Sequence, residues 1–210
     1  KNVMPDREVS SFLDFQNIGN DEFRSMGFCV IHAVPDNGIF RGESALLLLR
    51  DGDEREQVLS SSTGQIMDFD HGSGGYPSSL MGSLALVRQV MSDAEWYKSI
   101  VNKYEKKPSE FKRATYNRAL KEVDLGGRFF SIARDELDYD RILSLKNEFD
   151  LNVSIYGNGK EYRRIDVLNN LDSSLIIPIN FPKVPSVKDP VGAMDYSLEE
   201  LQHWEFAPSN

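Results

Sequence analysis

The histidines are the residues from which metal or proton-transfer chemistry would first be expected. His32, His71 and His203 are far apart in the sequence, and no two have the His-x-His or His-x-x-x-His spacing that presents two imidazoles to one metal ion. A zinc site built from them is therefore not predicted. His32 lies in an apolar run, which favours a hydrogen-bonded structural histidine over a role at the end of a strand. His71, in a glycine loop, is expected at the solvated surface.

The most informative loop is segment 36–42 (DNGIFRG), in which two glycines bracket one aromatic residue and one arginine after a predicted strand. Loops at the carboxyl ends of parallel strands carry the sites of α/β folds. Asp36 and Arg41 are therefore candidate substrate-binding residues. Tyr156 and Asn180 end two later predicted strands and are further candidates. The competing interpretation is that these polar residues only build loops and turns.

Two further features could carry chemistry. Segment 157–160 (GNGK) joins a strand to a helix, a setting in which backbone N–H groups can bind an anion. The phosphate-loop spacing is absent because Glu161 follows Lys160, so a tight turn is the favoured interpretation. The single cysteine, Cys29, excludes an internal disulfide, and its apolar neighbours predict a buried, inert thiol.

The elements that would position these residues follow from hydrophobic periodicity. Apolar residues spaced by three or four predict a long helix that begins at Ser78 or Ser79 and fades near Pro108. After residue 127, strands of five to seven residues alternate with helices, a β-α-β-α-β pattern typical of right-handed parallel crossovers. The sequence therefore predicts the α/β class. The expected helices are 21–26, 79–106, 114–123, 137–149, 161–171 and 197–203, and the expected strands are 28–34, 45–49, 57–60, 65–69, 128–133, 151–156 and 174–180.

Composition limits the possible partners. The chain of 210 residues has 24 basic and 33 acidic side chains, a net charge of −9, so binding to nucleic acid is not expected. The longest apolar run, 45–49, is too short for a membrane span, and the N-terminus has no apolar signal-peptide core. The length predicts one large domain, residues 1–210, with a proline-rich tail and a short helix in 181–210. Because the chain does not begin with Met, we expect a processed chain or a segment of a longer one.

Several short sequence segments are typical of a known family and occur in the same order as in that family. They are 26–28 (MGF), 34–35 (VP), 38–42 (GIFRG), 75–82 (GYPSSLMG), 86–89 (LVRQ), 93–97 (DAEWY), 161–164 (EYRR), 179–182 (INFP), 198–204 (LEELQHW) and 207–208 (AP). Together they resemble the amidohydrolase superfamily, in particular imidazolonepropionase-related members found in large multi-domain bacterial proteins. The resemblance covers most of the chain but includes no catalytic motif.

This resemblance implies a partial or degenerate (β/α)8 barrel of the TIM type, about six βα units with a parallel sheet, running from the second strand to the seventh. The family holds one or two divalent metals such as zinc, with His-x-His after the first strand, histidines after the fifth and sixth, and an aspartate after the eighth. The metal activates water that hydrolyses an amide or cyclic amide C–N bond. The first and eighth strands are expected outside this chain.

The expected histidine positions hold other residues. After strand 128–133 the chain offers Ile132, Ala133 and Arg134, and after strand 151–156 it offers Gly157. We therefore predict that the metal centre has been lost and that this chain holds no cofactor. One hypothesis is a segment of an amidohydrolase-like protein that supplies scaffold and substrate contacts. The alternative is a non-catalytic, degenerate barrel domain with a structural or interaction role, and a third is binding of a carbohydrate or small anion by Arg41 and segment 157–160.

The resemblance also implies partners and a compartment. A segment with six strands of an eight-stranded barrel has two exposed sheet edges. The proline-rich tail could shield an edge, or the edges could pair with those of a second copy in a homodimer. Other expected partners are the remaining domains of the parent protein. Members of the family often carry an export signal, which would place the parent in the periplasm or outside the cell.

Overall fold

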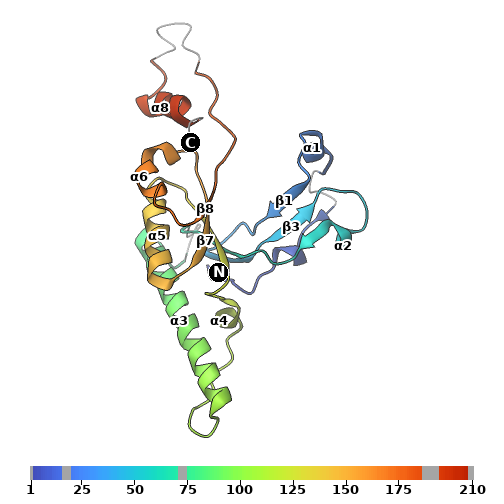
Figure 1. The fold of residues 1–210 in the computed structure, drawn as a ribbon, viewed down its shortest axis with the longest axis vertical. Coiled ribbons are helices and arrows are strands. Elements are labelled where there is room, and N and C mark those ends of the chain that lie inside the picture. Colours follow the sequence, from blue (N-terminus) through green and yellow to red (C-terminus); the bar gives the residue numbers. More distant parts are fainter. Residues whose placement is uncertain (1, 16–19, 71–74, 186–193, 208–210) are drawn as a thin grey trace. The chain divides into compact units, whose positions relative to one another are not determined.

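The computed structural model describes residues 2–15, 20–70, 75–185 and 194–207 (Figure 1). The chain divides into two compact units. Unit 1 comprises Lys1–Phe130 with Phe149–Asn152, and unit 2 comprises Ser131–Glu148 with Val153–Asn210. Strands β6 and β7 are each divided between the units. A single domain over the whole length stays a prediction.

The elements of the structure include most of the expected ones, with bounds shifted by a few residues, but Val9–Ser11, Phe40–Glu43 and Glu54–Gln57 were not predicted as elements and the expected helix 161–171 is divided in two. The elements are η1 (Val9–Ser11), α1 (Asn20–Ser25), β1 (Val30–Ala33), β2 (Phe40–Glu43), β3 (Ala45–Leu48), α2 (Glu54–Gln57), β4 (Val58–Ser60), β5 (Gln65–Met67), α3 (Leu80–Lys106), α4 (Arg118–Glu122), β6 (Arg128–Ile132), α5 (Asp138–Phe149), β7 (Asn152–Tyr156), η3 (Glu161–Arg164), α6 (Ile165–Leu168), β8 (Ser174–Ile176) and α8 (Leu198–Phe206). No helix in the described part of the chain is long and apolar enough to cross a membrane.

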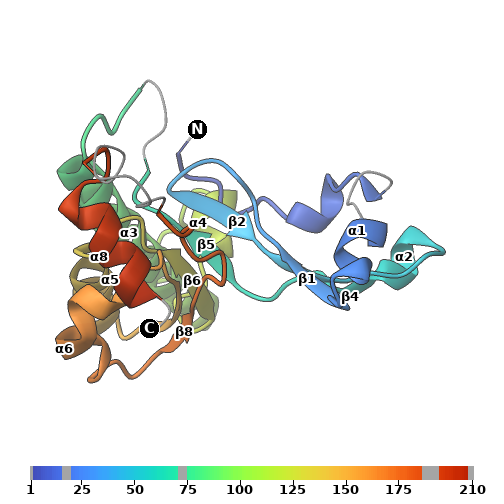
Figure 2. The ribbon, with the colours of Figure 1, turned by 90° about the horizontal axis from the view of Figure 1, so that it is seen from above.

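The first five strands pair in antiparallel fashion. Strands β1, β3 and β4 form one sheet in that order, and β2 pairs with β5. In Figure 2, α1 and α2 lie near the same end of the three-stranded sheet. Our expectation of parallel βα units is therefore wrong for this part of the chain. Parallel neighbours need a crossover of about a dozen residues or more, and the short links around β2 and β3 are not long enough.

The three-stranded sheet has its own small core. Val9, Ala45 and Leu47 are buried there, and side chains from β1 and β4 pack against them. Ala45 and Leu47 share one face of β3 because successive side chains on a strand point to opposite sides.

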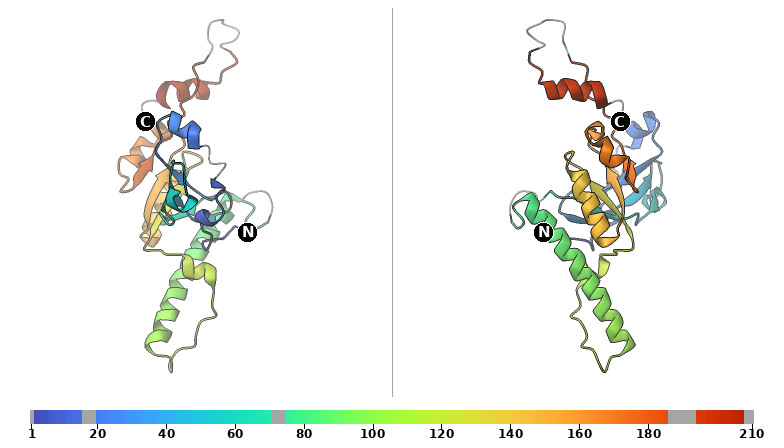
Figure 3. Two further views of the ribbon diagram at one scale, coloured as in Figure 1. Left: turned by 90° about the vertical axis from the view of Figure 1, so that its right-hand side faces the viewer. Right: turned by 60° about the vertical axis from the view of Figure 1, so that its left-hand side comes forward.

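Helix α3 confirms the prediction from periodicity. The Ser79 hydroxyl caps it by accepting a hydrogen bond of 3.2 Å from the Gly82 amide. The buried face runs from Leu84 to Tyr97, whereas Val101 and Tyr104 are only partly covered. After Lys107 the chain turns back along the helix toward α4, as Figure 3 shows.

Unit 2 has the alternating order that the sequence predicts. β7 and β8 pair in parallel, with Tyr156 opposite Ile176, and the Ala133 amide at the end of β6 donates to the Tyr156 carbonyl at 2.9 Å. Helix α5, labelled in Figure 1, follows β6 in the chain. It buries Tyr139, Ile142 and Leu145. The fold is therefore mixed α/β with parallel strands in one sheet. Among the described residues, the strands do not close into a barrel.

Candidate functional site

The loop that follows β7 is closed by a carboxylate from its own chain. Glu161 is the first residue of η3, and its Oε1 atom accepts hydrogen bonds from the Asn158 amide at 2.7 Å and the Gly159 amide at 3.0 Å. These are the N–H groups that segment 157–160 would have offered to an anion. The hypothesis of an anion site at this loop is therefore wrong, because the position is already taken by an internal anion.

Tyr139 completes this arrangement from helix α5. Its hydroxyl donates a hydrogen bond of 2.7 Å to Glu161 Oε1, and the side chains of Tyr139 and Glu161 are both buried, with 0% and 2% of their surface exposed. Burial, followed by the hydrogen bond to Glu161, raises the pKa of Tyr139 far above its ordinary value. The hydroxyl therefore stays protonated and acts as a permanent donor to the carboxylate.

Gly157 is required by the same geometry. A Cβ atom at this position would overlap Glu161 Oε1 and lie 3.0 Å from Glu161 Cδ. The Gly157 amide donates to the Ile176 carbonyl of β8 at 2.9 Å, which fixes the backbone in place. The carboxylate can enter the loop only because residue 157 has no side chain.

The loop that follows β6 has the same construction. Asp138 is the first residue of α5, and its Oδ2 atom accepts from the Arg134 amide at 2.8 Å and the Asp135 amide at 3.2 Å. The other oxygen of Asp138 lies 2.6 Å from Arg141 Nη1. Both strand-end loops of unit 2 are thus filled by a carboxylate from the first residue of the following helix. We call Glu161 and Asp138 the two loop carboxylates.

Arg41 has a structural environment that the sequence did not indicate. Segment 36–42 is not a rim loop as expected, since Phe40–Glu43 forms the antiparallel strand β2. The Arg41 guanidinium is buried in an ion pair with Asp68, and it also donates to the Gly38 and Pro35 carbonyls at 3.1 and 3.3 Å. An ion pair this deep inside unit 1 holds β2 and the residues after β5 together.

The other three predicted site residues are more accessible. Asp36 is largely exposed in unit 1, where its Oδ1 atom lies 3.7 Å from Arg7 Nη1. In unit 2, Tyr156 is half-buried at the end of β7 and burial raises its pKa, while Asn180 is exposed beyond β8. Contact of Asp36, Arg41, Tyr156 or Asn180 with a substrate stays a prediction.

The structure describes two of the three histidines. His32 Nε2 lies 2.9 Å from Thr63 Oγ1, the ring packs edge-on against Phe130 at 4.7 Å, and burial lowers its pKa. These contacts support the structural interpretation of His32. His203 on α8 stacks on Tyr162 at 6.2 Å, and His71 lies outside the described residues.

Cys29 lies in an exposed position directly before β1. The expectation of a buried thiol is therefore wrong. The Cys29 carbonyl accepts a hydrogen bond of 2.9 Å from the Leu49 amide next to β3, but the side chain lies at the surface.

The donor set of the described residues does not fit a divalent metal. In that part of the chain, no group of three or more histidine, cysteine, aspartate or glutamate side chains is arranged to hold a metal ion. At the two strand ends of unit 2, the loop carboxylates are used by backbone amides and by Tyr139.

Comparison with known proteins supports the fold. No family model and no curated protein matches the sequence. Among solved structures, the chain is similar to an amidohydrolase from Thermotoga maritima MSB8, with a TM-score of 0.73 and 16% identity over 99% of this chain and 56% of that one. The chain thus has an amidohydrolase-like fold and spans little more than half the length of that protein. At this identity the likeness concerns the fold alone.

Proposed function

We propose that this chain is the scaffold segment of an amidohydrolase-like, imidazolonepropionase-related protein of several domains. In the whole protein, an amide or cyclic amide C–N bond is hydrolysed with a divalent metal such as zinc, and the metal ligands belong to segments outside these 210 residues. The fold similarity supports this proposal, because it spans nearly the whole chain and 56% of the neighbour.

The observation that carries the proposal is the pair of loop carboxylates. The resemblance implies metal-binding histidines after these two strands. Instead, Asp138 and Glu161 hold the loop backbones from within. A carboxylate that accepts hydrogen bonds from two backbone amides stabilises its loop. Such a loop is more consistent with a scaffold than with a metal centre.

The second candidate is a non-catalytic, degenerate barrel domain with a structural or interaction role. The buried ion pair of Arg41 with Asp68 favours this candidate, because Arg41, which the sequence placed in a candidate binding loop, has a structural role. Under the first proposal, the substrate contacts come from Asp36, Arg41, Tyr156 and Asn180. Under the second, they are loop residues, and the partners are other domains of the parent protein or a second copy of the chain.

Elemental analysis tests the proposal. The chain and the full-length parent protein are incubated with zinc and manganese, desalted, and analysed for metal content and for hydrolysis of cyclic amides. We expect metal at less than about a tenth of an equivalent in the chain and a full complement in the parent. Stoichiometric metal in the chain would overturn the proposal and make His32→Gln the next variant to analyse. A metal-free and inactive parent would favour the second candidate.

A further inference from the structure

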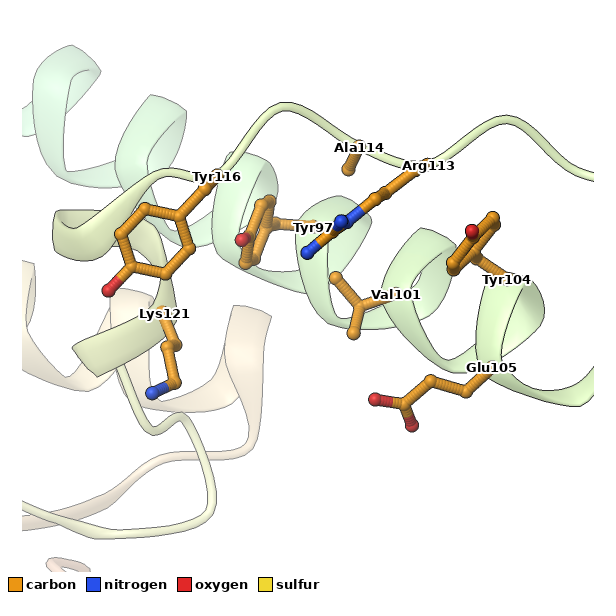
Figure 4. A pocket seen from close by; sticks show the side chains of 8 residues that line it. All are labelled: Tyr97, Val101, Tyr104, Glu105, Arg113, Ala114, Tyr116 and Lys121. Carbon is orange, nitrogen blue, oxygen red and sulfur yellow. The ribbon is translucent and has the colours of Figure 1, made fainter. Parts of the chain in front are cut away.

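The second half of α3 borders a pocket. It lies in unit 1 between the helix, the segment that returns from it and α4, and has a volume of about 300 Å³ (Figure 4). It is lined by Tyr97, Val101, Tyr104, Glu105, Arg113, Ala114, Tyr116 and Lys121. A neighbouring hollow of about 210 Å³ shares Tyr97, Val101 and Lys121 with it.

Helix geometry explains why the pocket exists. Tyr97, Val101 and Tyr104 are spaced by four and three residues, so they share one face of α3. Tyr97 is buried, whereas Val101 and Tyr104 are only partly covered. The opposite wall is an extended segment held at its two ends. Lys107 Nζ lies 3.0 Å from a Glu110 oxygen at one end, and the Asn117 amide donates to the Tyr97 hydroxyl at 3.4 Å at the other.

The charges at the pocket favour an anion. Arg113 and Lys121 contribute two cations against the single carboxylate of Glu105. Lys121 has an acidic neighbour, with 3.9 Å between Nζ and Glu122 Oε1. Among the described residues, Arg113 forms no hydrogen bond or ion pair, although its guanidinium extends over the pocket in Figure 4. An unpaired guanidinium beside aromatic rings offers a two-pronged donor to a carboxylate.

We propose that this pocket binds a small aromatic carboxylate. The aromatic ring of the ligand packs against the tyrosine and valine side chains of α3, and its carboxylate pairs with Arg113. A volume of about 300 Å³ is at the lower end of the range for small-molecule sites, which fits a ligand of one or two rings. The proposal is independent of the hydrolase assignment, because none of these residues belongs to the strand-end loops.

Calorimetric titration of the full chain with three probes tests the ligand chemistry. Phenylacetate carries the ring and the carboxylate, phenylacetamide is its neutral counterpart, and benzyltrimethylammonium carries a positive charge. We expect phenylacetate to bind at least about tenfold more tightly than the other two. Equal binding of the amide would show that the carboxylate is not recognised. Tighter binding of the ammonium would assign the tyrosines to a cation site. Either result, or no binding of phenylacetate, overturns the proposal.

Two matched variants test the assigned residue. Arg113→Gln removes the pocket cation, and Lys112→Gln removes the neighbouring exposed cation, which does not line the pocket. We expect Arg113→Gln to weaken phenylacetate binding about tenfold and Lys112→Gln to change it less than about twofold. Both side chains are exposed, so neither variant should unfold the chain, and circular dichroism checks this. Equal effects of the two variants would mean that only net charge acts, and would overturn the assignment to Arg113.

Discussion

Arg41 shows how the environment of a residue decides its role. Its sequence setting predicted a substrate contact, yet its guanidinium is buried against Asp68. A buried ion pair contributes little when both members are present, but removal of one member leaves an uncompensated charge in a medium of low dielectric constant. The exposed pair of Arg7 with Asp36 is its natural control.

We therefore expect Asp68→Asn to lower the free energy of unfolding by about 3–5 kcal/mol. Asp36→Asn should lower it by less than about 1 kcal/mol, because water screens an exposed pair. Urea denaturation followed by circular dichroism measures both values. A double variant, Arg41→Met with Asp68→Leu, should recover most of the loss. Similar effects of Asp68→Asn and Asp36→Asn would contradict the structural role assigned to Arg41.

Gly157 gives a second prediction for single residues. Gly157→Ala would push a methyl group into the Glu161 carboxylate, which cannot move without losing the hydrogen bonds from Asn158, Gly159 and Tyr139. We expect a loss of about 1–3 kcal/mol in urea denaturation. Gly126→Ala is the matched control, since its Cβ would meet only Asp124 Oδ1, at an ordinary 3.6 Å. A control as unstable as Gly157→Ala would refute the proposed overlap.

His32 gives a prediction about pH. Burial lowers its pKa below the ordinary value of 6.5, so the unfolded chain binds the proton first as the pH falls. Stability is therefore lost below about pH 6.5 until the folded histidine is also protonated. His32→Gln keeps a partner for Thr63 but does not titrate, so we expect its stability to depend less on pH between about 5 and 7. Thermal melts across this range measure it, and parallel curves for the two proteins would count against it.

At the scale of elements, the sequence predicted best what depends on local spacing. Helix α3, helix α5 and the strands of unit 2 were found because apolar periodicity and caps are local signals. Strand β2 was missed, because Gly38 before it and Gly42 within it are typical of a loop and its partner β5 is remote in sequence. The loop carboxylates were also missed. A carboxylate five or six residues after a strand end is visible in the sequence, but only the folded loop brings the amides to it.

The cap of α3 can be tested directly. The Ser79 hydroxyl accepts from the Gly82 amide at 3.2 Å, whereas the exposed Ser78 next to it caps nothing in the described structure. Ser79→Ala should lower the free energy of unfolding by about 1 kcal/mol, because a helix N–H loses its acceptor. Ser78→Ala should change it by less than about 0.5 kcal/mol. Chemical denaturation distinguishes the two serines, and a larger effect at Ser78 would place the helix start one residue earlier.

At the scale of the molecule, charge makes the clearest prediction. The net charge is −9, and the sequence pI is near 4.9. Binding to a polyanion would need cations gathered on one face, and many basic residues of unit 2 are already paired, as Arg141, Arg163 and Arg164 show. We expect no retention on immobilised heparin at pH 7 and low ionic strength, but firm retention on an anion exchanger. Retention on heparin would reopen nucleic acid as a partner.

The dependence between Gly157 and Glu161 constrains how this loop can change over evolutionary time. Any side chain at position 157, an imidazole included, meets the Glu161 carboxylate, so such a replacement is tolerated only after residue 161 has already changed. Glu161 in turn cannot be lost without leaving the buried Tyr139 hydroxyl and two amides in need of another acceptor. A replacement of Gly157 or of Glu161 alone therefore lowers the stability of the loop. Mutational paths that would bring a metal-binding side chain to this strand end therefore pass through a less stable intermediate, which makes the present state hard to reverse.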